Sequence, residues 1–345
     1  MKNTQINFPT IISEAAAADV SSLREFFFSD PSRPLVATGS GGAEAVGDFA
    51  SLLYGARGGM SLSVSPYTLN SFSDSALSTS KVLLVSKGGH NNDIIFAAKR
   101  SLSVNPSRSA SFTLYTGEKN EVRKLFLKAG STLSFDIPDL HVHDGFVSTE
   151  STLMYFALLC RVFDPDCDLR KYSTLPEVPY KVELNDGTPL SLSDLHGVNH
   201  FVFLHGSWGR PVSKALEGKF FESGMAPSTV VDLRNYCHGR FIFTSNHLEE
   251  SAVVFFVSPR EKDLVRRVRE FLPTSTKIIT IETESDSPEA SLDQLIRSNL
   301  LFTDLCEERG VDFSSPSNKG RIDKRKPMWI PFMSEMKKNG PLTLG

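Results

Sequence analysis

The sequence has no long hydrophobic run, and its 345 residues include only four cysteines and two tryptophans. No stretch approaches the roughly 18 consecutive apolar residues that a membrane-spanning helix needs. The N-terminal segment, MKNTQINFPTIISEAAAADV, also has no apolar core of the kind that export signals carry. We therefore expect a cytoplasmic protein.

Neither sign of charge is in large excess. The chain has 37 lysines and arginines against 40 aspartates and glutamates, for a net charge of -3, and 40% of its residues are hydrophobic. A chain without a basic excess is not suited as a whole to binding a polyanion. We expect a small-molecule partner, with neither nucleic acid nor a membrane as a partner.

The cysteines show neither a CxxC pair nor a metal-ligand spacing. They are Cys160, Cys167, Cys237 and Cys306. Cys160 and Cys306 lie in apolar helical patterns, which predicts buried, reduced thiols. His141 and His143 form an HxH pair, a weak signal for a metal on its own. We predict no metal and no other cofactor.

The chain contains an internal repeat. In each half an apolar run breaks at a glycine-containing turn and continues into a helical pattern, RPLVATGSGG at residues 33–42 and HFVFLHGSWG at 200–209. Each half then repeats this with KVLLVS at 81–86 and SAVVFFVS at 251–258. Continuous apolar runs separated by helices predict buried parallel strands. The predicted fold class is α/β, with two doubly wound, mainly parallel sheets flanked by helices.

A polar, proline-rich stretch at 164–194 separates the halves. The predicted parts are an N-terminal helical segment at 1–30, a first domain at 31–178, a second domain at 179–312 and a C-terminal tail at 313–345 that could cover the site. The N-terminal helix is expected at about residues 11–28. In doubly wound sheets, ligands bind beyond the carboxyl ends of the strands, so we look for chemistry there.

The segment SKGGHNND at 86–93 follows one such strand and precedes a helical pattern. A strand, a glycine-containing turn and a helix form the usual layout of an anion-binding loop. The candidate binding residues are Ser86, Lys87, Gly88, Gly89, His90 and Asn91, with Ser40 and Gly41 in the turn after the first strand. The alternative is that Asn91 or Asn92 only caps the helix and that the glycines only turn the chain.

Several segments, in this order along the chain, resemble the double sugar isomerase (SIS) family, which includes the isomerase half of glucosamine-6-phosphate synthase. They are TGSGGAEAV, VSKGGHNND, GFVSTESTLMYFALL, FLHGSWGRPVSKALEG, VVDLRNYCHGR and GVDFSSPSNKGR. The resemblance covers about residues 30–325 and is stronger to a less-studied bacterial branch than to the synthase. It implies a phosphosugar bound between the two halves, often in a dimer. Family members isomerise aldose and ketose phosphates, deaminate amino sugars, or sense phosphosugars.

The resemblance also shows how the anion loop departs from the family. Ser86 keeps the family serine, but Gly88 stands where a second serine is usual, and Asn91 replaces a threonine. In the first turn Gly41 stands at the family serine, with Ser40 one place earlier. Two hydroxyl donors are therefore lost to glycine, and a third is exchanged for an amide.

The resemblance implies that Glu222 is the base and that His238, sixteen residues later, is the ring-opening acid contributed by the neighbouring subunit of a homodimer. Lys219 lies one helical turn before Glu222 and matches a family lysine. Glu217 is a rival base, because ALEG lies two residues closer to Glu222 than in the synthase. The alternatives are that Glu222 faces solvent and that His238 only occupies a turn.

Three further positions are candidates. Ser148 matches a family serine that reaches the sugar, or else it caps the following helix. Arg240 has no counterpart in the synthase motif and could bind a carboxylate or phosphate through its guanidinium fork. Lys319 matches a C-terminal lysine that the family places over the sugar, with Arg321 as the alternative. Glu150 stands where the synthase has a lysine.

These observations support a phosphosugar isomerase or an amino-sugar-phosphate deaminase-like enzyme. The missing hydroxyls at Gly41 and Gly88 favour an alternative, a non-catalytic module that senses a phosphosugar and acts through a protein partner. A nucleotide-like anion is a third possibility. For it, Trp208 could stack on a base, although a partly buried packing role fits its position as well.

Overall fold

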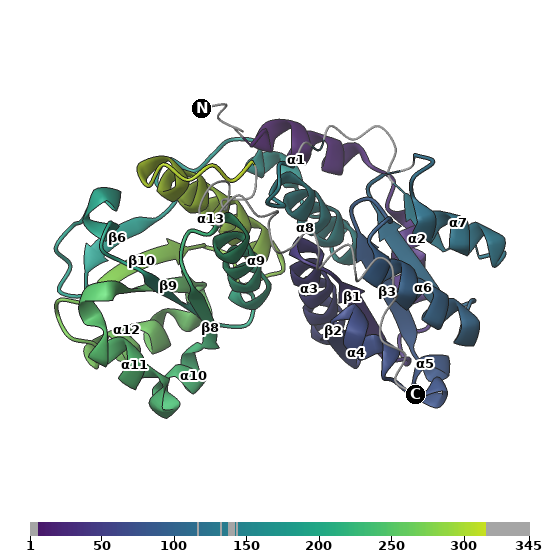
Figure 1. Ribbon diagram of the computed structural model, residues 1–345, viewed down its shortest axis with the longest axis horizontal. Helices are drawn as coiled ribbons and strands as arrows, with labels where there is room; N and C mark the ends of the chain where they lie inside the picture. The colour runs from purple at the N-terminus through teal and green to yellow at the C-terminus, as the bar shows by residue number, and fades with distance from the viewer. Residues whose placement is uncertain (1–5, 116, 132, 137–141, 143, 315–345) are drawn as a thin grey trace, which may run out of the picture. The chain divides into compact units, whose positions relative to one another are not determined.

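The computed structural model describes residues 6–115, 117–131, 133–136, 142 and 144–314 (Figure 1). His141, His143, Lys319 and Arg321 lie outside these residues. The described residues divide into a first unit, 14–142 with 161–166, and a second unit, 6–13 with 144–160 and 167–314. Within the described ranges, no helix combines the length and the apolar character needed to cross a membrane.

The first unit contains a five-stranded sheet of order β2-β1-β3-β4-β5, in which all neighbours pair in parallel. The strands are β1 (Leu35–Gly39), β2 (Ser61–Val64), β3 (Lys81–Ser86), β4 (Ser109–Thr113) and β5 (Ser134–Asp136). Every residue of β1, β3 and β4 is buried, and apart from Lys81 at the start of β3 their sequences are apolar or made of small residues.

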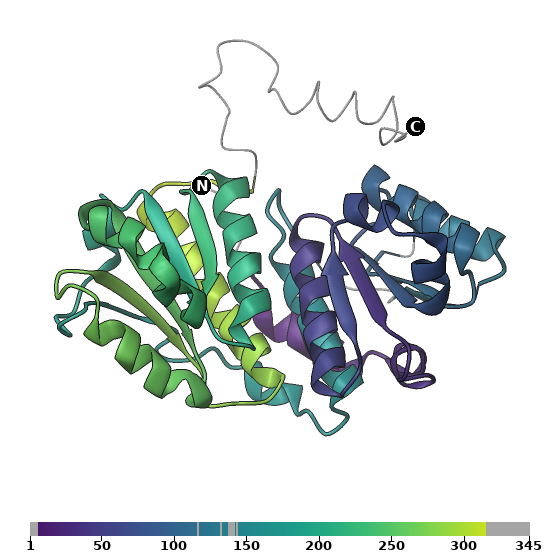
Figure 2. The ribbon, with the colours of Figure 1, turned by 90° about the horizontal axis from the view of Figure 1, so that it is seen from below.

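Helices cover both faces of this sheet (Figure 2). They are α2 (Ser21–Phe28), α3 (Gly42–Ala56), α4 (Pro66–Asn70), α5 (Asp74–Thr79), α6 (Asn92–Val104) and α7 (Glu121–Lys128). On one face Val36 and Leu84 cluster with Ile94 of α6 and Phe126 of α7. On the other face α3 approaches β1 closely, because Gly47 carries no side chain. The alternating faces make the sheet doubly wound.

The prediction of a single N-terminal helix is wrong, because the structure has two helices there. α1 spans Phe8–Ala17 and α2 spans Ser21–Phe28. Between them, the Oδ1 atom of Asp19 accepts a hydrogen bond from the backbone N–H of Ser21 at 2.9 Å. Such a local side-chain bond competes with continuation of a helix, so the chain restarts there.

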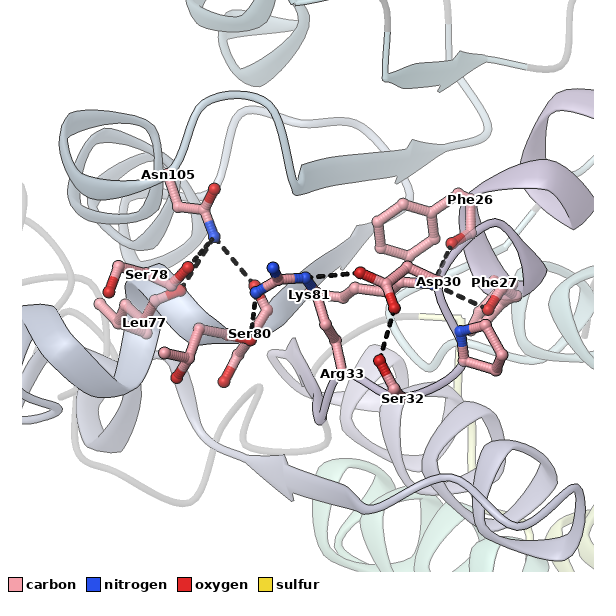
Figure 3. Close-up of polar contacts among 12 residues, drawn as sticks. Phe26, Phe27, Asp30, Ser32, Arg33, Leu77, Ser78, Ser80, Lys81 and Asn105 are labelled. Atoms are coloured by element: carbon pink, nitrogen blue, oxygen red, sulfur yellow. Dashed lines mark hydrogen bonds and ion pairs between the residues drawn. The ribbon is translucent and has the colours of Figure 1, made fainter.

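A buried lysine fixes the amino end of β3 (Figure 3). The Nζ atom of Lys81 donates to the carbonyl oxygens of Phe26 and Phe27 at 2.8 and 2.9 Å, at the C-terminal end of α2. Burial lowers the pKa of Lys81, against the charge of Asp30, which raises it. Asp30 itself pairs with Arg33 at 2.6 Å. These polar side chains therefore hold the end of the sheet opposite to the 86–91 loop.

The second unit contains a five-stranded sheet of order β6-β10-β9-β7-β8. The strands are β6 (Lys181–Leu184), β7 (His200–His205), β8 (Ser228–Asp232), β9 (Ser251–Val257) and β10 (Lys277–Glu282). Read from β8 to β6, this order repeats that of the first sheet from β2 to β5. Only β6 differs, because it pairs with β10 in an antiparallel direction.

The helices of the second unit also lie on both faces of its sheet. They are α9 (Gly209–Ser223), α10 (Leu233–Asn235), α11 (Phe241–Asn246), α12 (Lys262–Glu270) and α13 (Glu289–Glu308). On one face Val202 and Val253 pack with Val265 of α12. On the other, the ring of Phe220 in α9 lies 5.0 Å from that of Phe201. The predicted fold class, two mainly parallel sheets flanked by helices, is confirmed. A further helix, α8 (Glu150–Phe163), has residues in both units.

Candidate functional site

The 86–91 loop begins at the carboxyl end of β3 and has a fixed backbone. The Oγ atom of Ser86 accepts from the N–H of Gly89 at 3.2 Å. Gly89 has a φ of 61°, and a Cβ atom there would lie 1.9 Å from Oδ1 of Asn120. Position 89 therefore requires glycine for two reasons, its left-handed backbone and the space that Asn120 takes.

Asn120, which the sequence interpretation missed, lies beside Gly89 of this loop and joins the end of β4 to the start of α7. Its Nδ2 atom donates to Oγ1 of Thr113 at 2.9 Å and to the carbonyl of Tyr115 at 2.7 Å. Its Oδ1 atom accepts from the N–H of Arg123 at 2.9 Å. Only 1% of Asn120 is exposed. In the sequence, an asparagine before a helical pattern indicates no more than a helix cap.

His90 fills the space beside the bare α-carbon of Gly88. A Cβ atom at Gly88 would lie 2.4 Å from Nδ1 and from Cε1 of the His90 ring. The imidazole therefore stands where a serine side chain at position 88 would project. Within the described part of the chain, the backbone N–H groups of Gly88 and His90 have no hydrogen-bond partner. This part of the loop offers donors to an anion.

Asn91 caps α6, as the alternative interpretation predicted. Its Oδ1 atom accepts from the N–H of Asp93 at 2.9 Å. This bond leaves the Nδ2 amide of Asn91 as a donor. The 13-residue helix behind it adds the partial positive charge of a helix N-terminus. Capping and anion binding are therefore compatible at this position.

The turn after β1 lies beside this loop. Gly39 is in register with Val85 of β3, so Ser40 and Ser86 leave the sheet at the same edge. Gly41 begins α3 with a φ of 58°. The Oγ atom of Ser40 is shielded from solvent and has no partner among the described residues. Lys87 is half-buried in the same loop.

The second unit contains a buried lysine and a half-buried glutamate one turn apart on α9. Only 3% of Lys219 is exposed. Its burial lowers its pKa to about 8, although the charges of Glu222 and Asp144 oppose the shift. Burial raises the pKa of Glu222, against the charge of Lys219, and the charge of Asp144 raises it further. Both pKa values therefore move toward neutral pH, where a side chain can both accept and donate a proton.

Asp144, also missed from the sequence, lies at the start of α8. Its Oδ1 atom accepts from the N–H groups of Thr149 and Ser151 at 2.9 and 3.2 Å. Its charge acts on both Lys219 and Glu222. In a sequence, an aspartate a few residues before a helix indicates only a helix cap. Its effect on the pKa values of Lys219 and Glu222 could not be predicted from the sequence.

Ser148 does not cap α8 through its side chain, because Asp144 takes that role. The Oγ atom of Ser148 lies 2.6 Å from that of Ser151 and 3.2 Å from Oγ1 of Thr152. Glu150 is 5% exposed, and its Oε1 atom accepts from the N–H of Asn7 at 3.0 Å. A row of hydroxyl groups therefore begins the helix, with Ser148 half-buried at its start.

The last described residues of the chain pair with the segment that precedes Ser148. The N–H of Phe146 donates to the carbonyl of Ser314 at 3.1 Å, and that of Val147 to the carbonyl of Phe313 at 3.4 Å. The described chain therefore ends next to Ser148, five residues before Lys319 in the sequence.

His238 lies in a kinked segment after β8 and α10. Its φ and ψ are -87° and 40°, and Gly239 has a φ of 99°. His238 and Arg240 are both exposed. Among the described residues, neither side chain makes a hydrogen bond. Both are therefore available to a ligand or a partner.

Trp208 is a packing residue. It is 7% exposed, and its Nε1 atom donates to the carbonyl of Asp286 at 2.8 Å. Cys160 and Cys306 are buried and free, as predicted, and burial raises the pKa of Cys306 to about 12. No group of three or more potential metal ligands occurs among the described residues.

Neither the protein-family models nor the curated proteins include a match to this sequence. Solved structures do match. A glucosamine-6-phosphate deaminase from Thermotoga maritima has a TM-score of 0.65 at 16% identity, covering 91% of this chain and 98% of that one. A tagatose-6-phosphate ketose/aldose isomerase from Escherichia coli has a TM-score of 0.62 at 15% identity, with coverage of 86% and 89%.

The C-terminal domain of a glucosamine-fructose-6-phosphate aminotransferase from Francisella tularensis has a TM-score of 0.60 at 12% identity, with coverage of 89% and 95%. At such identities the similarity shows the fold. The fold that the sequence resemblance implied is thereby confirmed.

Proposed function

We propose that the protein binds a phosphosugar and catalyses an aldose-ketose isomerisation or an amino-sugar-phosphate deamination in the cytoplasm. The main support for the proposal is the pair of Lys219 and Glu222 on α9. Burial lowers the pKa of the lysine and raises the pKa of the glutamate. The fold is similar to that of a deaminase and an isomerase that act on hexose phosphates, which supports this class of substrate.

The phosphate would bind at the 86–91 loop. The donors are the hydroxyl of Ser86, the backbone N–H groups of Gly88 and His90, and the side-chain amide of Asn91. Lys87, Gly89 and the turn of Ser40 and Gly41 complete this set. The N-terminal end of α6 favours an anion there. His90 would supply a ring N–H in place of the hydroxyl that Gly88 lacks.

Glu222 would act as the base that removes the proton from C2 of the open-chain sugar and returns it to C1. General base catalysis is most effective when the pKa of the base lies near the working pH, so the raised pKa of Glu222 suits this role. Lys219 would stabilise the negative charge that develops on the enediol oxygen. Glu217, on the same helix, remains the rival base.

His238 would donate the proton that opens the sugar ring, reaching the site from the partner of a homodimer. It is exposed, and it precedes three exposed apolar residues, Phe241, Ile242 and Phe243, which are 41, 53 and 49% exposed. Exposed apolar side chains in such a group are typical of a surface that another protein covers. Arg240, between them and His238, would bind an anionic group of the ligand.

Ser148 and Lys319 would contact the sugar. Lys319 follows Ser314 by five residues, which span at most about 18 Å when extended. Because Ser314 is paired with the segment before Ser148, Lys319 is within reach of this region. The role of Lys319 rests on the family resemblance.

A non-catalytic phosphosugar or nucleotide sensor is the second candidate. The glycines at positions 41 and 88 favour it, because two hydroxyl donors of the family are missing there. Such a sensor would use the 86–91 loop and would not need the Lys219–Glu222 pair. It would act through a protein partner.

The deciding experiment combines a binding and a turnover assay. Thermal stabilisation by hexose, pentose and amino-sugar phosphates and by nucleotides identifies the ligand class. The isomerisation or deamination of the best sugar phosphate is then compared in the wild type, Glu222→Gln and Glu217→Gln. The enzyme proposal expects Glu222→Gln to bind the sugar but to lose at least 100-fold in kcat. Binding without turnover in the wild type supports the sensor, and stabilisation by nucleotides alone contradicts the isomerase.

A further inference from the structure

The second sheet has its own counterpart of the 86–91 loop. In the strand orders of the two sheets, β7 corresponds to β1 and β9 corresponds to β3. The segment 258–261, which we name the β9–α12 loop, therefore corresponds to the 86–91 loop. Each loop begins with a serine that is largely or fully buried, since Ser86 is 7% and Ser258 0% exposed.

A carboxylate of the protein itself occupies the β9–α12 loop. The Oε2 atom of Glu261 accepts from the N–H of Ser258 at 2.9 Å and from the Ser258 hydroxyl. Its Oε1 atom accepts from the N–H of Ser207 at 3.3 Å. Ser207 follows β7, whereas Ser258 follows β9. Donors from the ends of two neighbouring strands thus converge on one oxyanion.

The space for this carboxylate depends on a glycine. A Cβ atom at Gly206 would lie 2.0 Å from Oε1 of Glu261. Only 7% of Glu261 is exposed. The carboxylate is therefore enclosed between the turns that follow β7 and β9.

A second carboxylate, that of Asp286, also contacts the Ser258 hydroxyl. The Oδ1 atom of Asp286 accepts from the Ser258 hydroxyl at 2.8 Å and from the N–H of Arg260 at 3.2 Å. The Nε atom of Arg260 lies 3.4 Å from the same oxygen. A hydroxyl has one proton, so Ser258 donates to either Glu261 or Asp286 at a given moment. Asp286 can keep this hydroxyl in place if Glu261 is removed.

A local helix cap does not account for the whole arrangement. In a capping box, the side chain of the third helical residue bonds only the backbone of the cap residue. Ser258 and Glu261 make that bond. The contact with Ser207 is additional, because it joins the loop to a different strand. In the 86–91 loop, by contrast, the N–H groups of Gly88 and His90 have no partner among the described residues.

We propose that the second unit contains an oxyanion site which the side chain of Glu261 fills. Removing that side chain opens the site to a small oxyanion such as formate, acetate or sulfate. In the intact chain, Glu261 fills the β9–α12 loop, and a ligand anion binds instead at the equivalent 86–91 loop. This last clause rests on the proposed function, whereas the filled site does not.

The test is chemical rescue of Glu261→Ala in the full chain. The variant is expected to melt several degrees below the wild type in sodium chloride, and to regain much of this loss in sodium formate or sodium sulfate of the same ionic strength. The regain should saturate with formate concentration, as binding to one site requires. The wild type and Glu249→Ala, which removes an exposed glutamate of the same unit, should shift little. Equal shifts in Glu261→Ala and the wild type would overturn the proposal.

Two further measurements separate the alternatives. Glu261→Gln keeps the shape of the side chain, so formate should find no space and give no rescue. Rescue of Glu261→Gln equal to that of Glu261→Ala would show a general salt effect and overturn the proposal. If Glu261→Ala is insoluble, it is refolded from denaturant in formate or chloride. Recovery that depends on formate supports the site, and equal recovery contradicts it.

The outcome is independent of the proposed function. Formate rescue should persist when Ser86→Ala is added, because Ser86 belongs to the other sheet. Loss of sugar phosphate binding in Ser86→Ala with rescue intact supports both proposals. Rescue without any sugar phosphate binding in the wild type leaves the filled site standing and removes only the phosphosugar proposal.

Discussion

Lys219 and Glu222 lie one helical turn apart near the end of α9, and their environment moves the pKa of the lysine down and that of the glutamate up. The main cause is the same for both, since burial disfavours the charged form of each. Each charge partly offsets the burial of the other. Both pKa values therefore lie closer to neutral pH than those of the same groups in water.

The first prediction concerns stability and pH. The pKa of Lys219 is about 8 in the folded protein, below its usual 10.5, so between these values the unfolded chain binds more protons. The free energy of unfolding should therefore rise with pH across this window, by roughly 3 kcal/mol from this group. Urea unfolding at pH 7 and pH 10 measures the rise. Lys219→Met should flatten it, and Met at the exposed Lys128 should not. If the free energy of unfolding of Lys219→Met rises with pH as steeply as that of the wild type, Lys219 is not the source of the rise.

The second prediction concerns the pH dependence of turnover. The charge of Asp144 raises the pKa of Glu222, so Asp144→Asn should move the acidic limb of kcat/KM to lower pH. The same change also weakens the cap of α8, which should lower the melting temperature. A loss of stability with an unmoved acidic limb would assign Asp144 a structural role alone. Thr149→Ala, next to it, is the control for changes at this helix start.

The fold could be predicted because its signals are local. Buried parallel strands are continuous apolar runs, and both halves repeat the same order of runs and turns. The strands β2, β5, β6 and β8 were not predicted; in β6, for example, three of the four residues of KVEL are only half-buried and the strand is short. Asp144 and Asn120 were not predicted as parts of the site, because their partners Glu222 and Gly89 lie far away in the sequence. Glu261 was missed for a similar reason, since Ser207 is its distant partner.

The third prediction compares two glycines that share a left-handed backbone. Gly89 and Gly58 have φ values of 61° and 89°. An added Cβ atom would meet Asn120 at 1.9 Å at Gly89 and nothing within 4 Å at Gly58. Gly58→Ala should therefore cost about 1 kcal/mol of stability from backbone strain alone. Gly89→Ala should cost more and also weaken phosphate binding. If Gly89→Ala and Gly58→Ala lose the same stability, the side chain of Asn120 moves aside at little cost.

The last prediction concerns the exchange of a hydroxyl for an imidazole in the 86–91 loop. The ring of His90 fills the space that a side chain at position 88 would need. If this ring replaces the family hydroxyl, His90→Ala should weaken the binding of a sugar phosphate roughly 10- to 100-fold, which is what one hydrogen bond to an anion contributes. Gly88→Ser alone should be destabilising, because the serine and the ring would compete for one space.

Combining the two changes provides the decisive comparison. Gly88→Ser with His90→Ala removes the ring and supplies a hydroxyl in its place, so affinity should return to near the wild-type value. The coupling between the two positions, measured as a double-mutant cycle on the dissociation constant, should then be large. Independent effects at the two positions would show that the ring and the hydroxyl do not serve the same phosphate. In that case the glycine at position 88 would mark a loop adapted to a different anion, which is what the sensor proposal expects.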